Sequence, residues 1–324
     1  MEYPLLKIKN LNKAYGRRTI LKNINLDLMY GEILGVIGSS GSGKTTLLNA
    51  IIGFVKPNSG NILFRMKSPL GPTHVLYAKL KDEAKAIKNL YGFASQLPSF
   101  YEKLTVKENL EYFGKLYNLN DDTIESNSET LMKLMNLENS SNVLGKNLSG
   151  GMERRLDIAC AMMHNPKILI LDEPTADLDP VMRNNIWNLI EKINSKGTTV
   201  ILSSHHLNEL ETLCTRIAIL KEGKILGVAS AQELKETFYK DEAVKIQTYP
   251  GKYHALGEYL MNLFPHKIKK FSVNENELLL ACPKPQEVLN EIMEAIKRKN
   301  ERIIEIKIVH PSLDYIFMNI SDAK

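Results

Sequence analysis

The stretch that decides the fold is Gly38-Ser39-Ser40-Gly41-Ser42-Gly43-Lys44-Thr45-Thr46. An apolar run at 33–37 precedes it and predicts a buried strand, and an apolar run at 47–52 follows it and predicts a helix. A strand, a glycine-rich loop and a helix in this order are typical of a phosphate-binding loop. The glycines let the backbone wrap an anion, toward which the following helix directs its positive N-terminal end. The stretch therefore predicts a nucleotide site.

Two carboxylates follow a second buried strand. The run at 168–171 is continuously apolar, which fits a strand buried on both faces of a parallel sheet, and it ends in Asp172 and Glu173. Acids at a strand end are often only solvated, but here a phosphate-binding loop is present, and such strand ends point at the ligand crevice. We expect Asp172 to hold Mg²⁺ and Glu173 to accept a proton from the attacking water. In the loop, Lys44 is expected to reach the β- and γ-phosphates and the Thr45 hydroxyl to bind Mg²⁺.

Three further candidates lie near the ends of predicted strands. Tyr15 lies on a turn between alternating strands, where it either stacks on an adenine or packs on its own sheet. Gln96 leaves the strand predicted at 91–95 and either ligates Mg²⁺ or a water, or is a plain loop residue. His205 follows the strand predicted at 198–203 and either bonds the γ-phosphate or is an ordinary loop histidine.

The sequence contains a second helix start that suits an anion. Apolar residues at helical spacing over 106–119 and 129–137 predict a helical subdomain at about 98–164. The last helix of this subdomain is preceded by Leu148, Ser149, Gly150 and Gly151. Ser149 is expected to cap this helix, and the glycines leave its N–H groups open to an anion. A serine and two glycines before a helix more commonly serve capping alone, so these residues leave both interpretations open.

Length and composition limit the remaining possibilities. The 324 residues, 44% hydrophobic and 24% charged, fit one large domain with a smaller one, or two of similar size. The net charge of +5 comes from scattered basic residues, so no nucleic-acid partner is expected. The three cysteines lack metal-site spacing and indicate a reducing compartment. No apolar run approaches about 18 residues and no signal-peptide pattern opens the chain, so we expect a cytoplasmic protein.

Taken in order, these motifs resemble the nucleotide-binding subunit of an ATP-binding-cassette (ABC) transporter over roughly residues 5–235. The specific part is Leu-Ser-Gly-Gly about twenty residues before Asp-Glu-Pro-Thr, because the phosphate-binding loop, Walker A, occurs in many unrelated ATPases and GTPases. The matching positions are the A-loop Tyr15, Walker A 38–46, the Q-loop Gln96, the signature 148–151, Walker B 168–172, the catalytic Glu173, the D-loop Asp179 and the switch His205.

The resemblance implies a fold, an activity and partners. The expected fold is an α/β P-loop NTPase cassette with a mixed or parallel core sheet, an antiparallel β subdomain and a helical subdomain. The expected activity is Mg²⁺-dependent ATP hydrolysis that powers transport, with export favoured, through a separate transmembrane permease. Two cassettes, identical or different, dimerise head to tail, so that Ser149 of one copy completes the phosphate site of the other. The chain is expected on the cytoplasmic face of the membrane.

Some positions depart from the family pattern, and other functions compete. Ser95 stands where proline is common, Asp177 replaces a small D-loop residue, and Cys160 replaces a frequent arginine. Cassette proteins of ribosomes usually carry two cassettes, whereas this chain has one Walker A. Those of chromosomes insert long coiled coils between Walker A and the signature, where this chain has no room for one. A binding module that hardly hydrolyses ATP is disfavoured by Glu173 and His205.

The segment 236–324 lies outside the cassette, assigned to 1–235. Its predicted elements follow the order β-α-β-β-α-β, which indicates a small ferredoxin-like α+β domain. They are a strand at 244–248, a helix at 253–263, strands at 267–273 and 277–281, a helix at 286–297, a strand at 302–309 and a last helix at 313–320. Similar tails occur in the drug- and lipid-exporting, ABC-2-like class. Regulation or support of the dimer is a hypothesis for its role.

Overall fold

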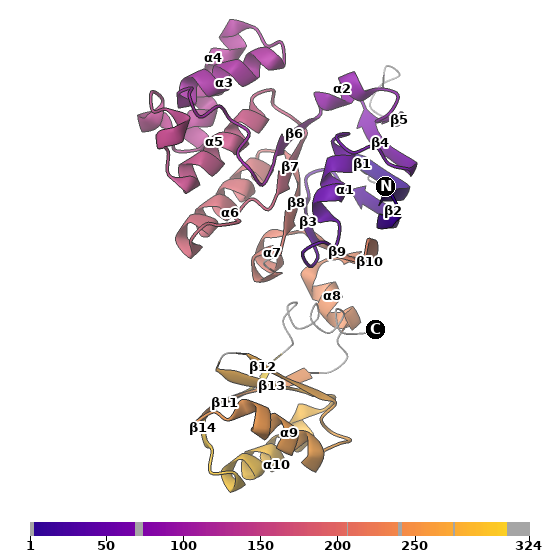
Figure 1. Ribbon diagram of the computed structural model, residues 1–324, viewed down its shortest axis with the longest axis vertical. Coiled ribbons are helices and arrows are strands. Elements are labelled where there is room, and N and C mark those ends of the chain that lie inside the picture. The colour runs from indigo at the N-terminus through magenta and orange to yellow at the C-terminus, as the bar shows by residue number, and fades with distance from the viewer. Residues whose placement is uncertain (1–2, 69–73, 206, 239–241, 275, 310–324) are drawn as a thin grey trace. The chain divides into compact units, whose positions relative to one another are not determined.

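The computed structural model describes residues 3–68, 74–205, 207–238, 242–274 and 276–309 (Figure 1). The chain divides into two compact units, Met1–Ser230 and Ala231–Lys324, and each has its own hydrophobic cluster. The second unit begins with α8 (Ala231–Phe238). No helix among the described residues is both long enough and apolar enough to cross a membrane.

The central sheet of the first unit has the strand order β10-β9-β3-β8-β7-β6. Its strands are β3 (Ile33–Ile37), β6 (Tyr91–Ala94), β7 (Ile168–Asp172), β8 (Thr199–Ser204), β9 (Arg216–Lys221) and β10 (Lys224–Ala229). Neighbouring strands from β9 to β6 pair in parallel, whereas β9 and β10 form an antiparallel hairpin. Every residue of β3, β7 and β8 is buried, as expected for parallel strands covered on both faces. The sheet confirms the predicted α/β class.

The second sheet of this unit is antiparallel and has the order β2-β1-β4-β5. Its strands are β1 (Leu6–Tyr15), β2 (Arg18–Leu28), β4 (Ser59–Met66) and β5 (Leu76–Lys79). Leu6 lies opposite Leu28, and Ile8 lies opposite Leu26, so these four buried side chains share one face. The predicted antiparallel β subdomain is therefore present. Its last strand, β5, has no counterpart in the sequence analysis.

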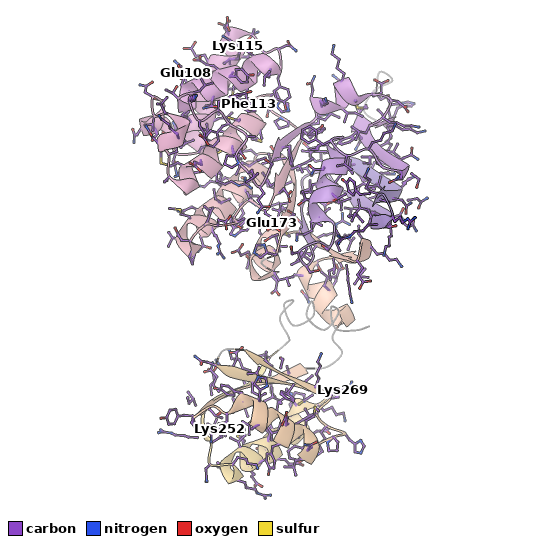
Figure 2. All side chains as sticks on the ribbon, in the orientation of Figure 1. Glu108, Phe113, Lys115, Glu173, Lys252 and Lys269 are labelled. Carbon is purple, nitrogen blue, oxygen red and sulfur yellow. The ribbon has the colours of Figure 1, made fainter. Side chains whose placement is uncertain are left out.

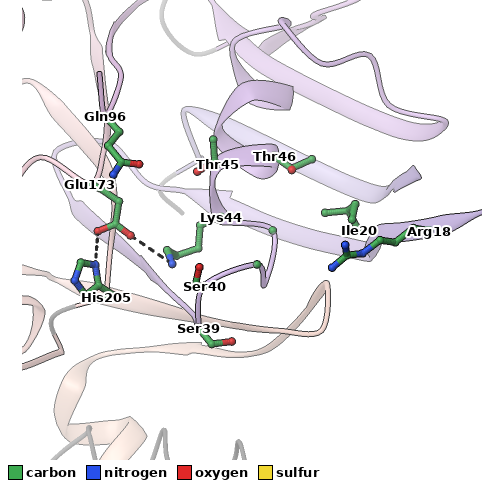
Figure 3. Close-up of a pocket in the computed structure, with 12 residues that line it drawn as sticks. Arg18, Ile20, Ser39, Ser40, Lys44, Thr45, Thr46, Gln96, Glu173 and His205 are labelled. Carbon is green, nitrogen blue, oxygen red and sulfur yellow. Dashed lines mark hydrogen bonds and ion pairs between the residues drawn. The ribbon is translucent and has the colours of Figure 1, made fainter. Parts of the chain in front are cut away.

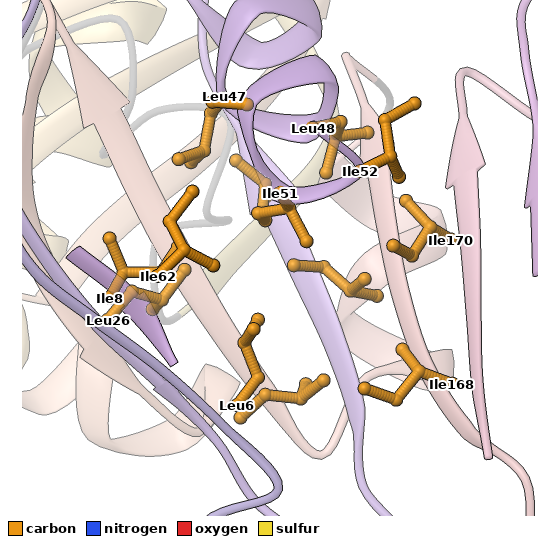
Figure 4. Packing of buried hydrophobic residues seen from close by; sticks show 14 of the residues in the cluster. Leu6, Ile8, Leu26, Leu47, Leu48, Ile51, Ile52, Ile62, Ile168 and Ile170 are labelled. Atoms are coloured by element: carbon orange, nitrogen blue, oxygen red, sulfur yellow. The ribbon is translucent and has the colours of Figure 1, made fainter. Parts of the chain in front are cut away.

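One helix connects the two sheets in a common core. In α1 (Lys44–Ile51), the side chains of Leu47, Leu48 and Ile51 are fully buried. They belong to the same cluster as Ile170 of β7 and residues of both sheets, as Figure 4 shows. Burial of each such side chain contributes about 1.5–3 kcal/mol. This packing fixes the start of α1, and with it the end of the phosphate-binding loop.

The remaining helices of the first unit include one separate group, α3, α4 and α5 (Figure 1). The helices are α2 (Ala84–Lys88), α3 (Val106–Leu116), α4 (Asp121–Leu134), α5 (Gly150–Met162), α6 (Pro180–Ser195) and α7 (Leu207–Leu213), with 3₁₀ turns at Glu138–Ser140 and Gly145–Asn147. The group is the helical subdomain that the predicted fold requires, whereas α7 was not predicted.

Local signals explain where the helices of this group begin. The Thr105 hydroxyl accepts from the Glu108 N–H, and the Glu108 carboxylate accepts from the Thr105 N–H, which forms a capping box at α3. Figure 2 shows Glu108 on α3 with Lys115 toward its other end, where a cation interacts favourably with the helix dipole. Asn120 caps α4, which begins at Asp121.

The second unit contains an antiparallel sheet with the order β12-β13-β11-β14. Its elements are β11 (Glu242–Tyr249), α9 (Tyr253–Leu263), β12 (Lys270–Asn274), β13 (Glu277–Cys282), α10 (Pro285–Arg298) and β14 (Arg302–Val309). Alternate residues of the strands, including Val244 and Leu280, pack against Leu260 of α9 and Ile292 of α10. The order and pairing confirm the ferredoxin-like fold. The helix expected at 313–320 lies outside the described residues.

Candidate functional site

The phosphate-binding loop lines a cavity of about 650 Å³ at the carboxyl end of β3 (Figure 3). The loop residues that line it are Ser39, Ser40, Gly41, Gly43, Lys44, Thr45 and Thr46. The cavity is completed by Arg18, Ile20, Gln96, Glu173 and His205. The structure thus brings together residues that are up to 187 positions apart in the sequence, from Arg18 to His205.

Glycine is required at three points of this loop. A Cβ at Gly38 would lie 2.5 Å from the carbonyl oxygen of Leu220, which is a steric clash. Gly41 and Gly43 have φ angles of +79° and +111°, in the left-handed region that other residues avoid. Helix α1 then begins at Lys44, so its first N–H groups have no acceptor within the helix. Such N–H groups beside a cavity are suited to an anion.

A polar triad lies across this cavity (Figure 3). The Nζ atom of Lys44 donates to the carbonyl oxygen of Gly38 at 2.7 Å and lies 3.4 Å from Oε1 of Glu173. Nδ1 of His205 lies 2.8 Å from Oε2 of the same glutamate. The side chains of Lys44 and Glu173 are 9% and 11% exposed, whereas that of His205 is 52% exposed. The three predicted residues therefore meet, and Glu173 bridges the other two.

The residues predicted to hold Mg²⁺ also share one hollow. Thr45, Gln96 and Asp172 line a neighbouring space of about 730 Å³. Asp172 is buried, and the Ser203 hydroxyl donates to its Oδ1 at 2.6 Å while accepting from the Glu173 N–H at 2.9 Å. A hydroxyl, an amide oxygen and one oriented carboxylate are hard oxygen donors, which fit Mg²⁺ together with phosphate oxygens. Among the described residues, no cluster of three or more His, Cys, Asp or Glu offers an alternative.

The signature residues lie in a different hollow of the same chain. Ser149, Gly151 and Asp179 line a space of about 270 Å³ that shares no lining residue with the cavity of Lys44. Asp179 caps α6, and its Oδ1 accepts from the N–H groups of Val181 and Met182. One chain therefore does not bring Ser149 to its own phosphate-binding loop. Leu148 is buried beside this segment.

One predicted detail of the signature is wrong. Ser149 occupies the N-cap position of α5, but its hydroxyl makes no capping hydrogen bond. Its carbonyl oxygen instead accepts from the N–H groups of Met152 and Glu153. Helix α5 begins with Gly150 and Gly151, and the N–H groups at this start therefore have no side-chain cap.

The structure does not bring Tyr15 into the cavity. Its ring is 51% exposed and has the ammonium of Lys13 at 4.6 Å from its centroid. The residues of this region that line the cavity are Arg18 and Ile20, at the start of β2. Neither residue was predicted to lie in the site, although the alternation of β2 gives the face on which they lie.

Comparison with known proteins identifies the chain. A family model described as ABC transporter matches residues 21–176. The chain is 31% identical to the linearmycin resistance ATP-binding protein LnrL of Bacillus subtilis (strain 168) over 98% of both proteins. The chain belongs to the ABC transporter family. Its expected activity, ATP hydrolysis by a cassette subunit, follows from this membership, and so does ATP binding.

Other members of the ABC transporter family match over most or all of the chain. Nod factor export ATP-binding protein I of Rhizobium leguminosarum bv. viciae is 27% identical and covers 98% of this chain and 94% of its own. The dimeric structure of MJ0796, a bacterial ABC transporter cassette, aligns with a TM-score of 0.59 at 30% identity, over 69% of this chain and 98% of that one. The full-length matches to resistance and export proteins agree with the exporter class that the segment 236–324 indicated.

An arginine of this ABC cassette was missed by the sequence analysis. Arg154 follows the signature by one turn of α5 and is 8% exposed. It donates to the carbonyl oxygens of Ser95, Asp172 and Pro174, which belong to the segments that carry Gln96 and Glu173. Its burial becomes visible only when α5 is packed in the fold, so no local sequence pattern marks it.

Proposed function

We propose that two cassettes close around ATP, so that Lys44 of one copy and Ser149 of the other contact the same triphosphate. The separation of the two hollows in one chain supports this arrangement, because a single copy has only half of the contacts. The uncapped start of α5 supplies the second set of N–H groups for an anion. A two-fold axis then generates two identical composite sites. The partner is either a second copy of this chain or another cassette.

Each residue of the triad has a role in hydrolysis. The Lys44 ammonium binds the β- and γ-phosphates, and the N–H groups of residues 38–46 cradle them. Glu173 orients the attacking water and accepts its proton, and His205 holds the carboxylate by the hydrogen bond to Oε2. Removing such a base costs about 10²–10⁴-fold in rate.

We assign the magnesium site to Thr45, Gln96 and Asp172. When bound there, Mg²⁺ neutralises charge on the β- and γ-phosphates. The Ser203 hydroxyl holds the Asp172 carboxylate in one orientation, which is a typical arrangement around a metal ligand.

An apolar surface beside Gln96 supports docking of a membrane subunit. Phe54, Leu97 and Leu116 are exposed and line the hollow that also contains Gln96. Exposed apolar residues around a hollow commonly mark an interface. We infer that the permease binds here and that the cassette lies on the cytoplasmic face of the membrane. The names of the full-length relatives, a resistance protein and an export protein, favour export.

The composite site is tested by mixing two inactive variants. Ser149→Arg blocks the site of the neighbouring copy, and Lys44→Ala removes the phosphate contact of its own site. A heterodimer of the two retains one intact site, so an equimolar mixture should regain about a quarter of the wild-type ATPase rate if copies pair at random. A mixture of Lys44→Ala with Glu173→Gln is the matched control, because both changes lie on the same side of a site and every heterodimer site is damaged. Equal rates in the two mixtures would contradict the proposal.

A further inference from the structure

The guanidinium of Arg154 binds the carbonyl oxygens of the residues before and after Glu173. Its Nη2 donates to the carbonyl oxygen of Asp172 at 2.9 Å, and its Nε donates to that of Pro174 at 2.9 Å. Arg154 does not line the cavity of Lys44, so it has no contact with the phosphate site in this chain. It acts on the backbone that carries the carboxylate.

The backbone at Glu173 needs such support. Its φ angle is +48°, in the left-handed region that a residue with a side chain rarely adopts. Conformations of this kind persist only where the surroundings hold them. The Glu173 N–H donates to the Ser203 hydroxyl, and the flanking carbonyl groups are held by Arg154. Because the ring of Pro174 fixes its own φ angle, holding the carbonyl groups of Asp172 and Pro174 restricts the backbone rotation at Glu173 and with it the direction of the side chain.

The same guanidinium reaches the strand end that carries Gln96. Nη1 of Arg154 donates to the carbonyl oxygen of Ser95 and lies 3.4 Å from Oδ2 of Asp157. Asp157 in turn accepts from both the N–H and the hydroxyl of Ser99, on the other side of Gln96. A single side chain of α5 therefore connects the signature helix, the Gln96 segment and the backbone of Glu173.

We propose that Arg154 is a positioning residue that aligns the carboxylate of Glu173 with the γ-phosphate and couples this alignment to α5 and to the Gln96 segment. The proposal rests on the role of Glu173 given above. A planar guanidinium donates in several fixed directions at once, whereas an ammonium is a single point charge. Lysine at this position therefore keeps the charge and loses the geometry.

The first test is the Arg154→Lys variant. It should lower kcat for ATP about 10–100-fold and leave the affinity for ATP within about twofold, because the phosphate contacts are unchanged. Arg216→Lys is the matched control. Arg216 also pairs with a buried carboxylate, Glu32, and with a carbonyl oxygen, that of Asp27, and it lies outside the cavity of Lys44. This control should lose stability without losing kcat.

A double-mutant cycle separates positioning from a general structural effect. Arg154→Lys introduced into the Glu173→Gln variant should change the residual rate by less than about twofold, because the group that it positions has been removed. An equal loss in both backgrounds would overturn this inference alone. Wild-type turnover of Glu173→Gln by itself would overturn the role of Glu173 and this inference with it. Asp157→Asn, which removes the charge that pairs with Arg154, gives the same cycle if Arg154→Lys does not fold.

Discussion

The ammonium of Lys44 and the carboxylate of Glu173 form an ion pair, with 3.4 Å between Nζ and Oε1, and both side chains are mostly buried. The lysine is the group expected to bind the triphosphate, and the glutamate is the group expected to accept the proton. We therefore propose that ATP competes with Glu173 for the ammonium. In this proposal, ATP takes Lys44 from Oε1 of Glu173 and leaves that oxygen to the attacking water, while Oε2 keeps the contact with His205.

The Glu173→Gln variant should bind ATP more tightly and hydrolyse it more slowly. Removing the competing carboxylate charge frees Lys44 for phosphate, so the affinity for ATP should rise several-fold. Turnover should fall about 10²–10⁴-fold because the amide cannot accept the proton. Titration with a fluorescent ATP analogue and single-turnover hydrolysis measure the two effects. Glu191→Gln, an exposed change on α6, is the control, and weaker binding by Glu173→Gln would contradict the ion-pair argument.

The Lys44→Ala variant should lose affinity for ATP about 10–100-fold, the value of one or two charge-assisted hydrogen bonds. Its effect should be smaller when Glu173 is also changed to glutamine, because the buried carboxylate would no longer lie unpaired beside the phosphates. The same fluorescence titration of the single and double variants measures this. Identical losses in both backgrounds would show that the two side chains act independently.

Much of this site was predictable because its residues follow strands of one parallel sheet. The loop after β3, Asp172 as the last residue of β7 and His205 after β8 all lie at the carboxyl ends of neighbouring strands. The carboxyl ends of parallel strands share one edge, so a motif after each strand predicts a common site. This prediction of a common site does not require the positions of the strands in space.

The missed residues depend on packing that no local pattern records. Arg154 reaches three carbonyl oxygens only because α5 lies against the ends of β6 and β7, and an arginine on a helix is otherwise a solvated side chain. The entry of Arg18 into the cavity, and the absence of Tyr15 from it, depend on the course of the turn between β1 and β2. The bond from Ser203 to Asp172 similarly requires the register of two strands.

The Asp172→Asn variant should require more Mg²⁺ for hydrolysis. The amide carries no charge, so the Mg²⁺ concentration at half-maximal rate should rise at least tenfold. Ser203→Ala should give a smaller rise in the same direction, because it removes only the hydrogen bond that orients Asp172. Hydrolysis measured against Mg²⁺ at saturating ATP distinguishes the two. An unchanged magnesium requirement in Asp172→Asn would exclude this carboxylate as a ligand.

The stability of the first unit should depend on pH through His164. Burial lowers the pKa of this histidine from 6.5 to about 4. Its ring stacks on Tyr117, with centroids 3.6 Å apart, and Nε2 lies 3.0 Å from the carbonyl oxygen of Tyr91. That carbonyl requires Nε2 to be the protonated nitrogen, and Nδ1 is buried with no hydrogen-bond partner among the described residues. The folded chain therefore favours the neutral ring.

The direction of the effect follows from this pKa. Between about pH 6.5 and 4 the unfolded chain binds a proton at His164 and the folded chain does not, so the free energy of unfolding falls as the pH falls through this range. Above pH 6.5 the residue contributes no pH dependence. At pH 4.5 the loss should be about 2 kcal/mol. His164→Gln keeps a donor for Tyr91 and removes the titration, so this part of the pH dependence should disappear in the variant.

The single tryptophan of the chain makes this measurable. Trp187 is buried in α6 of the first unit, so its fluorescence reports unfolding of that unit in denaturant. Carboxylates also titrate in this range, so the quantity to compare is the difference between pH 7 and pH 4.5 in the wild type and in each variant. The exposed His254, in α9 of the second unit, supplies the control His254→Gln, which should follow the wild type. If His164→Gln also follows the wild type, the folded chain does not keep the imidazole neutral.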